Sequence, residues 1–384
     1  MAGGGRPPPA IAPDSAEVWC DPERGASVTS SRPKVLFVFN QQVYDSCTAQ
    51  PAQLERLAQF TDWEWLPLEG GPRFGANPDP AALEQLLDPI SEVAGLVICH
   101  GSPRIDAAVL DRAPRLRIIG ELEGDRFAER IDLDAAWARD ICVVDTTHGS
   151  SYPVSEWALA LILISLRNAG EHFRHTIEHN VYVPPRTGWT PTRLDGKKVG
   201  LIGCGHIGRR LITYLQPFHC DIRVHDPYLP KVIPDIMGFQ LTSLDHVLAD
   251  SDVVVCLAPL TPATQRMIGR RELELLQAGS VFVNVSRGAI VDPEALIERL
   301  QRGDIVAGLD VFDPEPIPAD SPIKDLPNVF VTPHIAGIGR GVDTFLKLMV
   351  DELDRYFHGH ETLYDLTPRT RANRTGTPMP LGGE

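Results

Sequence analysis

The chain has few of the features that mark extracellular, membrane or nucleic-acid-binding proteins. Its seven cysteines are odd in number and include no CxxC pair, so we expect reduced thiols and a cytoplasmic protein. No basic run interrupts the formal net charge of −15, which disfavours a nucleic-acid partner because a phosphate backbone would be repelled. Residues 1–10 hold one arginine and no apolar segment, so no secretory signal is expected. The longest apolar run, residues 157–166, is too short to span a bilayer, and no membrane partner is expected.

What the chain does contain fits a globular protein of two domains. It has 384 residues, of which 43% are hydrophobic and 23% are charged. Residues 1–33 are rich in proline, glycine and serine and show no periodicity, which predicts a disordered leader. Residues 367–384 have a similar composition and are expected to form a flexible tail.

Between these ends, short apolar runs alternate with helix-like stretches, a pattern typical of parallel sheets covered by helices on both faces. The sequence therefore predicts an α/β protein. The first series of strands is expected at residues 35–39, 61–66, 95–99, 116–119 and 141–144, with helices that include 81–87 and 105–113. The second series is expected at residues 198–202, 221–225, 253–257, 281–285, 305–309 and 329–332. Six such strands with intervening helices make a complete Rossmann sheet.

Two longer helices are predicted between and after these series. Residues 154–167 are apolar on nearly all sides, so we expect this helix to be buried, and a subunit interface would bury it. Residues 342–357 are amphipathic and follow the second series of strands. If this last helix packs on the first sheet, the first domain is discontinuous and the chain crosses twice between the domains. The cleft between the domains is then the expected ligand site.

A glycine-rich motif opens the second series. Gly203, Gly205 and Gly208 follow a strand and lead into a helix, and Asp226 stands at the end of the next strand. In this context the first glycine makes a tight turn, the second lets the backbone approach a pyrophosphate, and the third lets helix and strand pack closely. The helix N-terminus offers N–H groups to the anion, while Asp226 would accept hydrogen bonds from ribose hydroxyls and repel a 2′-phosphate. The motif predicts a dinucleotide site that prefers NAD to NADP; the alternative is an ordinary tight turn beside a surface aspartate.

Charged residues follow the later strands of the same series. Arg287 stands just after a strand, where a guanidinium suits a carboxylate or a carbonyl oxygen, although alone it would be read as a surface residue. Asp310, Asp313 and Glu315 would usually mark a solvated loop, and no histidine or cysteine neighbour completes a metal site there, so no metal is expected. His334 follows the next strand, and adjacent parallel strands could bring it beside Glu315. A carboxylate beside an imidazole favours the imidazolium, which is a general acid for carbonyl reduction and, once deprotonated, a base for the reverse reaction.

Taken together, these motifs resemble the D-isomer-specific 2-hydroxyacid dehydrogenases. The resemblance runs from about residue 34 to residue 357 and is most specific over residues 194–337. Besides the glycine motif and Asp226, it is carried by Ser251-Asp252-Val253-Val254, Ala258-Pro259-Leu260-Thr261-Pro262, Asn284-Val285-Ser286-Arg287-Gly288, Val291-Asp292, Gly308-Leu309-Asp310-Val311-Phe312 and Thr332-Pro333-His334-Ile335-Ala336-Gly337.

The resemblance implies a fold, a cofactor and roles for single residues. It implies a Rossmann NAD-binding domain over residues 153–337, connecting helix included, and a discontinuous flavodoxin-like substrate domain over 34–152 and 338–366. His334 would be the acid/base, Glu315 its partner, and Arg287 the residue that orients and polarises the substrate carbonyl. A homodimer acting on a 2-oxo or 2-hydroxy acid is implied as well. The cofactor NAD would be bound by Gly203, Gly205, His206, Ile207, Gly208, Asp226, Ala258, Val285, Ser286, Asp310 and Gly337, with Asp310 near the nicotinamide amide.

The chain departs from this family at the loop that usually binds the substrate carboxylate through backbone N–H groups. Here the loop reads Gly120-Glu121-Leu122-Glu123-Gly124-Asp125-Arg126-Phe127, which is longer and carries three acids. Backbone donors could still bind a carboxylate there, but side-chain carboxylates nearby would weaken the binding. We therefore expect a larger or polyfunctional 2-oxo acid rather than pyruvate. The residues assigned to substrate binding are His100, Glu123, Gly124 and Arg287, and the other candidate cleft residues, each of which alone could be structural, are Ser102, Arg126, His148 and Tyr152.

Two classes of function remain open. The first is an NAD-dependent oxidoreductase that reduces a 2-oxo acid. Reductases of glyoxylate, hydroxypyruvate and 3-phosphohydroxypyruvate share this fold family, as do oxidants of formate or phosphite, although a formate-type site would carry glutamine where Glu315 stands. The second is an NAD(H)-sensing, corepressor-like binding protein with little turnover, a role that some members of the fold fill.

Overall fold

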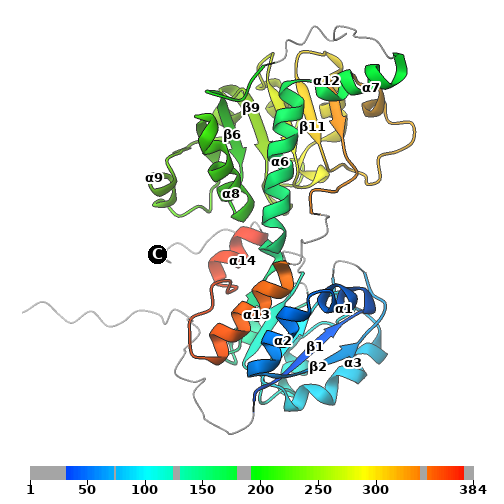
Figure 1. Ribbon diagram of the computed structural model, residues 1–384, viewed down its shortest axis with the longest axis vertical. Coiled ribbons are helices and arrows are strands. Elements are labelled where there is room, and N and C mark those ends of the chain that lie inside the picture. Colours follow the sequence, from blue (N-terminus) through cyan, green and yellow to red (C-terminus); the bar gives the residue numbers. More distant parts are fainter. Residues whose placement is uncertain (1–31, 73–74, 124–129, 180–191, 338–343, 376–384) are drawn as a thin grey trace, which may run out of the picture.

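The computed structural model describes residues 32–72, 75–123, 130–179, 192–337 and 344–375. Its elements are grouped around two parallel sheets, which lie one above the other in Figure 1. The predicted leader, up to residue 31, and most of the acidic loop, including Gly124 and Arg126, lie outside the described residues. None of the helices that the structure describes combines the length and the apolar character needed to cross a membrane.

The first sheet has the strand order β2-β1-β3-β4-β5, and all its strands are parallel. This is the order of flavodoxin-like folds, in which ligands bind where the direction of winding reverses, here between β1 and β3. The strands are β1 (Lys34–Phe39), β2 (Asp62–Pro67), β3 (Gly95–Ile98), β4 (Ile118–Glu121) and β5 (Cys142–Asp145). The helices among them are α1 (Gln41–Thr48), α2 (Pro51–Phe60), α3 (Pro80–Leu87), α4 (Ala107–Asp111) and α5 (Leu133–Trp137), with the 3-10 turn η2 (Pro89–Glu92).

The second sheet has seven parallel strands in the order β12-β11-β10-β9-β6-β7-β8. The direction of winding reverses between β6 and β9, as in Rossmann sheets, so the predicted fold class is confirmed. The strands are β6 (Lys198–Ile202), β7 (Asp221–His225), β8 (Gln240–Leu241), β9 (Val253–Cys256), β10 (Val281–Asn284), β11 (Val306–Leu309) and β12 (Val329–Val331). The helices are α8 (His206–Leu215), α9 (Ile233–Met237), α10 (Leu244–Ala249), α11 (Arg270–Glu274) and α12 (Pro293–Gln301).

Most strands of both sheets are short apolar segments buried on both faces, whereas the edge strands β2 and β8 have no buried residue. In β9, for example, the segment Val253-Val254-Val255-Cys256 is buried at every position. Successive side chains of a strand point to opposite faces, so a continuous apolar run, rather than an alternating one, is needed when helices cover both sides. Two apolar clusters accordingly flank each sheet.

Two helices tie the sheets together. α6 (Ser151–Leu166) leaves the first sheet and packs on β10, β11, β12 and α8 of the second, which buries Ala158, Leu161 and Ile162 completely. α7 (Ala169–His179) follows it. α13 (Thr344–Phe357) returns to the first sheet, where Met349 and Val350 join the apolar cluster beside β1 and β3. The chain therefore crosses between the sheets twice, and its C-terminal part completes the first sheet.

Residues 368–375 form the helix α14 (Pro368–Thr375), where the sequence predicted a flexible tail. Its start is fixed by Thr367 and Thr370, because the backbone N–H of each donates to the hydroxyl of the other. Arg371 forms an ion pair with α5, whereas Arg369 donates to a carbonyl of the loop after β7. Polar contacts to both halves of the molecule hold this helix, so hydrophobic periodicity gave no signal for it.

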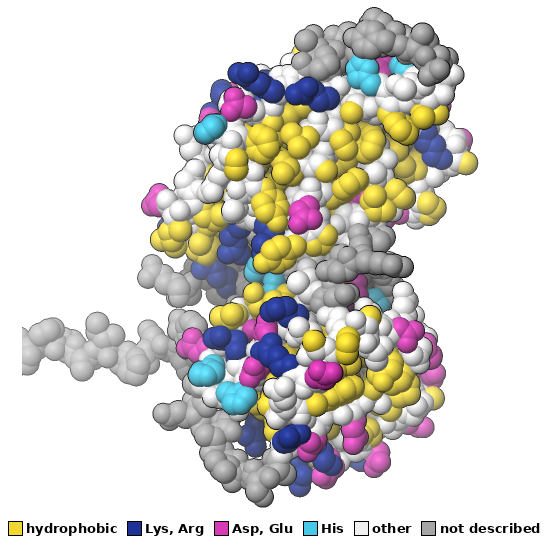
Figure 2. Space-filling model, in the orientation of Figure 1, with side chains coloured by type: hydrophobic (Ala, Val, Ile, Leu, Met, Phe, Trp, Pro, Cys, Tyr) yellow, Lys and Arg dark blue, Asp and Glu magenta, His cyan; other side chains and the backbone are white. Residues whose placement is uncertain are grey.

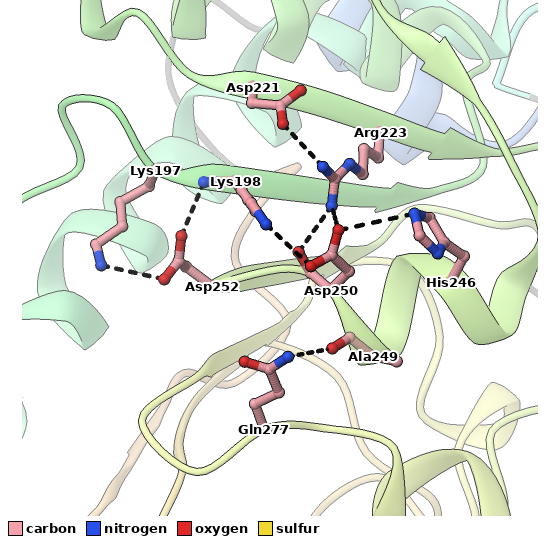
Figure 3. A network of polar contacts seen from close by, with 9 residues as sticks. All are labelled: Lys197, Lys198, Asp221, Arg223, His246, Ala249, Asp250, Asp252 and Gln277. Carbon is pink, nitrogen blue, oxygen red and sulfur yellow. Dashed lines mark hydrogen bonds and ion pairs between the residues drawn. The ribbon is translucent and has the colours of Figure 1, made fainter.

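A polar network fastens the amino ends of the central strands of the second sheet (Figure 3). Asp250 accepts hydrogen bonds from Lys198 and Arg223, and Asp252 accepts one from Lys197. Because β6, β7 and β9 are parallel, this network lies at the sheet edge opposite to the one where their carboxyl ends meet. Its charges therefore stabilise the sheet and leave the other edge for ligands.

Candidate functional site

The carboxyl ends of the two sheets face one another. β5 leads through the 3-10 turn η3 (Thr147–Ser150) directly into α6. The ring of His148 in this turn lies 4.6 Å from the ring of His206, the first residue of α8 at the carboxyl end of β6. Since the strands within each sheet are parallel, the loops after the strands of one sheet open toward those of the other. Ligands of α/β proteins bind at such edges.

The glycine-rich turn fits a pyrophosphate. Gly203 has a φ of +93°, and a Cβ there would lie 2.8 Å from the backbone nitrogen of Ala258, so protein packing alone requires this glycine. Gly205 is different, because its φ is −71° and a Cβ on it would meet no other described atom within 4 Å. Its small size leaves space outside the chain, next to the N-terminus of α8, which carries no side-chain cap. An anion can therefore reach the first N–H groups of α8, beginning at His206 and Ile207.

Asp226, at the end of β7, turns its carboxylate toward this glycine turn. Its Oδ2 accepts the N–H of Cys204 at 2.8 Å, and its Oδ1 accepts the N–H of Tyr228 at 2.9 Å. These bonds fix the carboxylate, and each of its oxygens can accept one more hydrogen bond. The geometry suits the ribose hydroxyls that the sequence assigned to it.

The structure brings Glu315 and His334 into direct contact. The Nδ1 of His334 lies 2.9 Å from the Oε2 of Glu315, and the other carboxylate oxygen accepts the N–H of Phe312 at 2.8 Å. The two side chains are 41% and 36% exposed, so the pair stands at the surface of the cleft where a substrate can reach it. His334 also has a φ of +55°, a left-handed conformation that is rare outside glycine and needs support from its surroundings.

Asp310 supplies that support. Its side chain is completely buried, and its carboxylate accepts the hydroxyl of Thr332 at 2.6 Å and the N–H groups of Ile335 and Ala336, both at 2.9 Å. Its backbone carbonyl accepts the N–H of His334 at 2.8 Å. Both carboxylate oxygens thus hold the loop of His334, and the contact with the nicotinamide amide stays a prediction. Reasoning from the sequence missed this role, because it depends on how the loop folds back over β11.

Arg287 stands at the carboxyl end of the neighbouring strand β10. Asn284 braces the turn before it, because its side chain accepts the N–H of Ser286 at 3.0 Å and donates to the carbonyl of Arg287 at 3.1 Å. The hydroxyl of Ser286 donates to the carbonyl of Ala258, which ties β10 to the loop after β9. The guanidinium donates to the carbonyl of Ser286. Val285 is buried in the core, so only its backbone remains for a cofactor.

A pocket of about 490 Å³ adjoins the Glu315–His334 pair. Its wall combines the pair and the hydroxyl-bearing Thr332 with apolar side chains that include Phe312, Ile317 and Val331. Such a pocket is large enough for a small molecule and offers only a few polar contacts, which is typical of ligand sites.

The remaining candidate cleft residues lie on the first sheet or at the crossing between the sheets. His148 stacks on Tyr364 with ring centroids 3.6 Å apart, and the guanidinium of Arg210 lies 3.1 Å from the ring centre of Tyr152. Ser102 is buried and donates to the carbonyl of Pro103. The contact between Arg210 and Tyr152 joins α8 of the second sheet to the start of α6, at the crossing. Nothing in the sequence indicated the contact of Tyr364, because His148 is far away along the chain.

The acidic loop is partly neutralised by a buried ion pair. Glu121 and Arg130 are 1% and 0% exposed, and their side chains meet at 2.6 Å. Glu123 lies at the carboxyl end of β4, close to His100, which follows β3. Of the acids in this loop, Glu121 is therefore compensated within the protein, whereas Glu123 belongs to the wall that faces the second sheet.

The comparisons with known proteins agree with this architecture. Residues 159–336 match the family model described as D-isomer specific 2-hydroxyacid dehydrogenase, NAD binding domain. A glyoxylate reductase of Aeropyrum pernix is 32% identical over 79% of this chain and 88% of the relative. A D-3-phosphoglycerate dehydrogenase of Methanocaldococcus jannaschii is 34% identical over 65% of this chain and 47% of the relative. A solved structure of a Pyrococcus horikoshii protein has a TM-score of 0.66 and 26% identity, and the match covers 88% of this chain and 96% of that one.

These matches differ in how much of each relative they cover. The chain spans about half the length of the phosphoglycerate dehydrogenases that it matches, but 88% of the glyoxylate reductase. The matched model is that of an NAD-binding domain, which covers the second half of α6 and the second sheet, so NAD is the cofactor of this sheet. The chain belongs to the family of D-isomer-specific 2-hydroxyacid dehydrogenases.

Proposed function

We propose that the protein is an NAD-dependent D-2-hydroxyacid dehydrogenase that works as a reductase of a 2-oxo acid. The observation that carries this proposal is the contact between His334 and Glu315 at the carboxyl edge of the nucleotide-binding sheet. With Nδ1 of the imidazole engaged by the carboxylate, Nε2 is left to exchange a proton with the oxygen of a substrate. Glu315 would hold the ring in place and stabilise its charged form.

The other residues would divide the work of binding. Arg287, at the end of the adjacent strand, would orient and polarise the carbonyl of the substrate through its guanidinium. Gly205 and the N-terminus of α8 would receive the pyrophosphate, and Asp226 the ribose hydroxyls, which favours NAD over NADP. When bound, the nicotinamide would supply the hydride that passes to the substrate carbon. Asp310 would hold the loop of His334 so that the imidazole stays in position beside the substrate.

The substrate would be a 2-oxo acid that is larger or more polar than pyruvate. Glu123, at the carboxyl end of β4, supports this view, because the position usually offers only backbone donors to a carboxylate. A plain 2-oxo acid would meet a side-chain carboxylate there, which offers no hydrogen-bond donor, whereas a substrate with a further donor group can use it.

The first test is NADH consumption by the purified protein with a panel of 2-oxo acids, run in parallel with NADPH. The panel should contain pyruvate, glyoxylate, hydroxypyruvate, 3-phosphohydroxypyruvate and longer polar 2-oxo acids. We expect turnover on one class, with NADH preferred and pyruvate poor. Binding of NADH without turnover on any of them would contradict the proposal and favour the NAD(H)-sensing binding protein.

Replacing the proposed acid/base gives a sharper test. His334→Ala should lower kcat by roughly 1,000-fold or more, while the affinity for NADH stays within a few-fold, because general acid–base catalysis contributes about 100- to 10,000-fold. Glu315→Gln should lower kcat less, since the amide can still orient the ring. His360→Ala, at an exposed position beyond α13, serves as the control and should leave kcat unchanged. If His334→Ala loses NADH binding as well, the histidine is structural.

A further inference from the structure

A second cluster of chemically active side chains lies on the first sheet, opposite the nucleotide-binding sheet. Cys99 and His100 directly follow β3, and Glu123 follows the adjacent strand β4. The first sheet reverses its direction of winding between β1 and β3, and the loops after these strands are joined there, because the N–H of Asn40 donates to the carbonyl of His100 at 2.8 Å. The cluster thus occupies the position at which α/β sheets bind ligands.

The three side chains converge. A sulfur of Cys99, a ring nitrogen of His100 and a carboxylate oxygen of Glu123 all lie within 4.8 Å of one another. Cys99 is 0% exposed and His100 is 7% exposed, whereas Glu123 is half-buried at the side of the cleft. The thiol of Cys99 donates to the backbone carbonyl of Glu123 at 3.9 Å, which ties the ends of β3 and β4 together. Thiolate, imidazole and carboxylate are the three ligand types that proteins use for zinc.

The ligands of the cluster can also balance the charge of a dication. Arg130 forms the buried ion pair with Glu121, and Glu123 places a further carboxylate beside Cys99 and His100. A bound dication displaces the proton of a coordinating thiol, so Cys99 would bind it as the thiolate. A Cys99 thiolate and the Glu123 carboxylate would then balance its two charges.

We propose that Cys99, His100 and Glu123 bind a divalent transition-metal ion of the zinc type at the wall of the cleft that faces the nucleotide-binding sheet. The mixed sulfur, nitrogen and oxygen ligands select against magnesium and calcium, which prefer oxygen alone. Three protein ligands leave a fourth position of a tetrahedral ion open, which is the arrangement of zinc sites that bind a water molecule or a substrate. The sequence predicted no metal here, because Glu123 is distant from Cys99 and His100 along the chain.

A metal ion at this site would also explain how a loop rich in acidic residues can bind an acidic substrate. This explanation rests on the proposed dehydrogenase function. The carboxylate of Glu123 has no hydrogen-bond donor to offer the carboxylate of a 2-oxo acid. A dication bound to the same side chain would balance its charge, and the open position of the ion could take a carboxylate or a carbonyl oxygen of the substrate. The substrate would then be anchored by the metal on one sheet and by Arg287 on the other.

The experiment is a titration of the metal-free full-length protein with Zn²⁺ and with Co²⁺, without any substrate or activity measurement. Wild-type protein should bind about one equivalent of Zn²⁺, and Co²⁺ should give the absorption band of a thiolate ligand. Cys99→Ser should abolish this band, and His100→Ala and Glu123→Gln should each weaken Co²⁺ binding by at least about 10-fold. Cys47→Ser replaces another buried cysteine of the same sheet and should change neither result.

Thermal melting and NADH binding of every variant show whether the protein is folded, and Glu123→Gln, at a half-buried position, is the variant least able to disturb the core. Absence of stoichiometric Zn²⁺ binding, or unchanged Co²⁺ affinity in Glu123→Gln, would overturn the metal site. The metal site would also be overturned if metal-free protein bound a 2-oxo acid with a terminal ammonium group and Glu123→Gln lost this binding. Glu123 would then bind the cationic group of a substrate. Metal binding is scored without turnover, so its failure and the failure of the dehydrogenase proposal can be told apart.

Discussion

Gly203 and Gly205 stand two positions apart in one turn, yet the structure gives them separate tasks. Gly203→Ala should destabilise the protein by about 2 kcal/mol or more, because the new Cβ would meet the backbone of Ala258 in a left-handed conformation. Gly205→Ala should change the stability by less than about 1 kcal/mol, since no described atom lies near its Cβ. It should nevertheless weaken NADH binding by roughly 10-fold or more, because the methyl group takes space that the cofactor would use.

Thermal melting and a fluorescence titration with NADH distinguish the two glycines. If the pyrophosphate binds at this turn, Gly205→Ala should lower the affinity for NADH but hardly change the stability, whereas Gly203→Ala should lower both. Equal NADH affinity of wild type and Gly205→Ala would show that the cofactor does not approach this glycine.

At the scale of residues, the sequence was most informative for reactive side chains that follow the ends of neighbouring strands. Glu315 and His334 follow adjacent parallel strands, so their proximity could be predicted, and the structure places them 2.9 Å apart. The support from Asp310 could not be predicted, because it depends on backbone N–H groups that a loop turns inward. For a similar reason Cys99 was predicted only to be a reduced thiol, since nothing in its neighbourhood along the chain points to Glu123.

At the scale of elements, α13 combines an apolar face with a buried acid. Glu352 is 0% exposed, and its Oε2 accepts the N–H groups of Leu363 and Tyr364 at 2.8 and 3.1 Å. Burial raises its pKa above the usual value. A raised pKa in the folded state means that stability is fully present below the pKa of the unfolded chain and is lost as the pH rises through the folded value. Ionised Glu352 therefore weakens the docking of α13 at neutral pH.

Glu352→Gln should remove this dependence on pH. The amide oxygen can still accept the two N–H groups, but the side chain cannot ionise. The free energy of unfolding of the variant relative to wild type should accordingly increase between about pH 4, near the unperturbed pKa of glutamate, and pH 7. Urea unfolding at both values measures it. Glu361→Gln, at an exposed position nearby, should show no such trend, and a constant difference for Glu352→Gln would refute the explanation.

Most strands could be predicted from apolar runs, because the inner strands of both sheets are short apolar segments buried on both faces. β8 was missed since Gln240–Leu241 is too short to show a pattern and its residues are exposed. α14 was missed because arginines, rather than an apolar stripe, attach it. The apolar character of α6 was interpreted correctly as burial, but the second sheet of its own chain covers most of it.

At the scale of the whole molecule, apolar side chains remain exposed along α6 and α7. Leu163 is 40% exposed, and Phe173 and Ile177 of α7 are 67% and 72% exposed. Figure 2 shows hydrophobic side chains gathered on the face of the upper domain over which α6 runs. Monomeric proteins rarely leave such patches in water, and we propose that this face forms the interface of a homodimer.

The double variant Leu163→Glu/Phe173→Glu should convert a dimer into a monomer, because it would bury unpaired charges in the proposed interface. Sedimentation velocity measures the change. Ile236→Glu is a matched control, since Ile236 on α9 is also 72% exposed but lies on another part of the surface. A monomeric wild type, or a dimer that survives the double substitution, would disprove this interface.

The return of α13 to the first sheet has a consequence for how the protein is made. Val35, Phe37, Ile118 and Val144 of the first sheet pack in one cluster with Leu346, Met349 and Val350 of α13. A ribosome adds about 5–20 residues per second, so roughly 10–40 s pass between the synthesis of β5 and that of α13. Throughout this time, one face of the first sheet has the cover of α1 and α2 but lacks that of α13, and all strands of the second sheet are synthesised before α13 begins. The nucleotide-binding sheet can therefore fold first during translation, and the part of the protein synthesised first is the last to be completed.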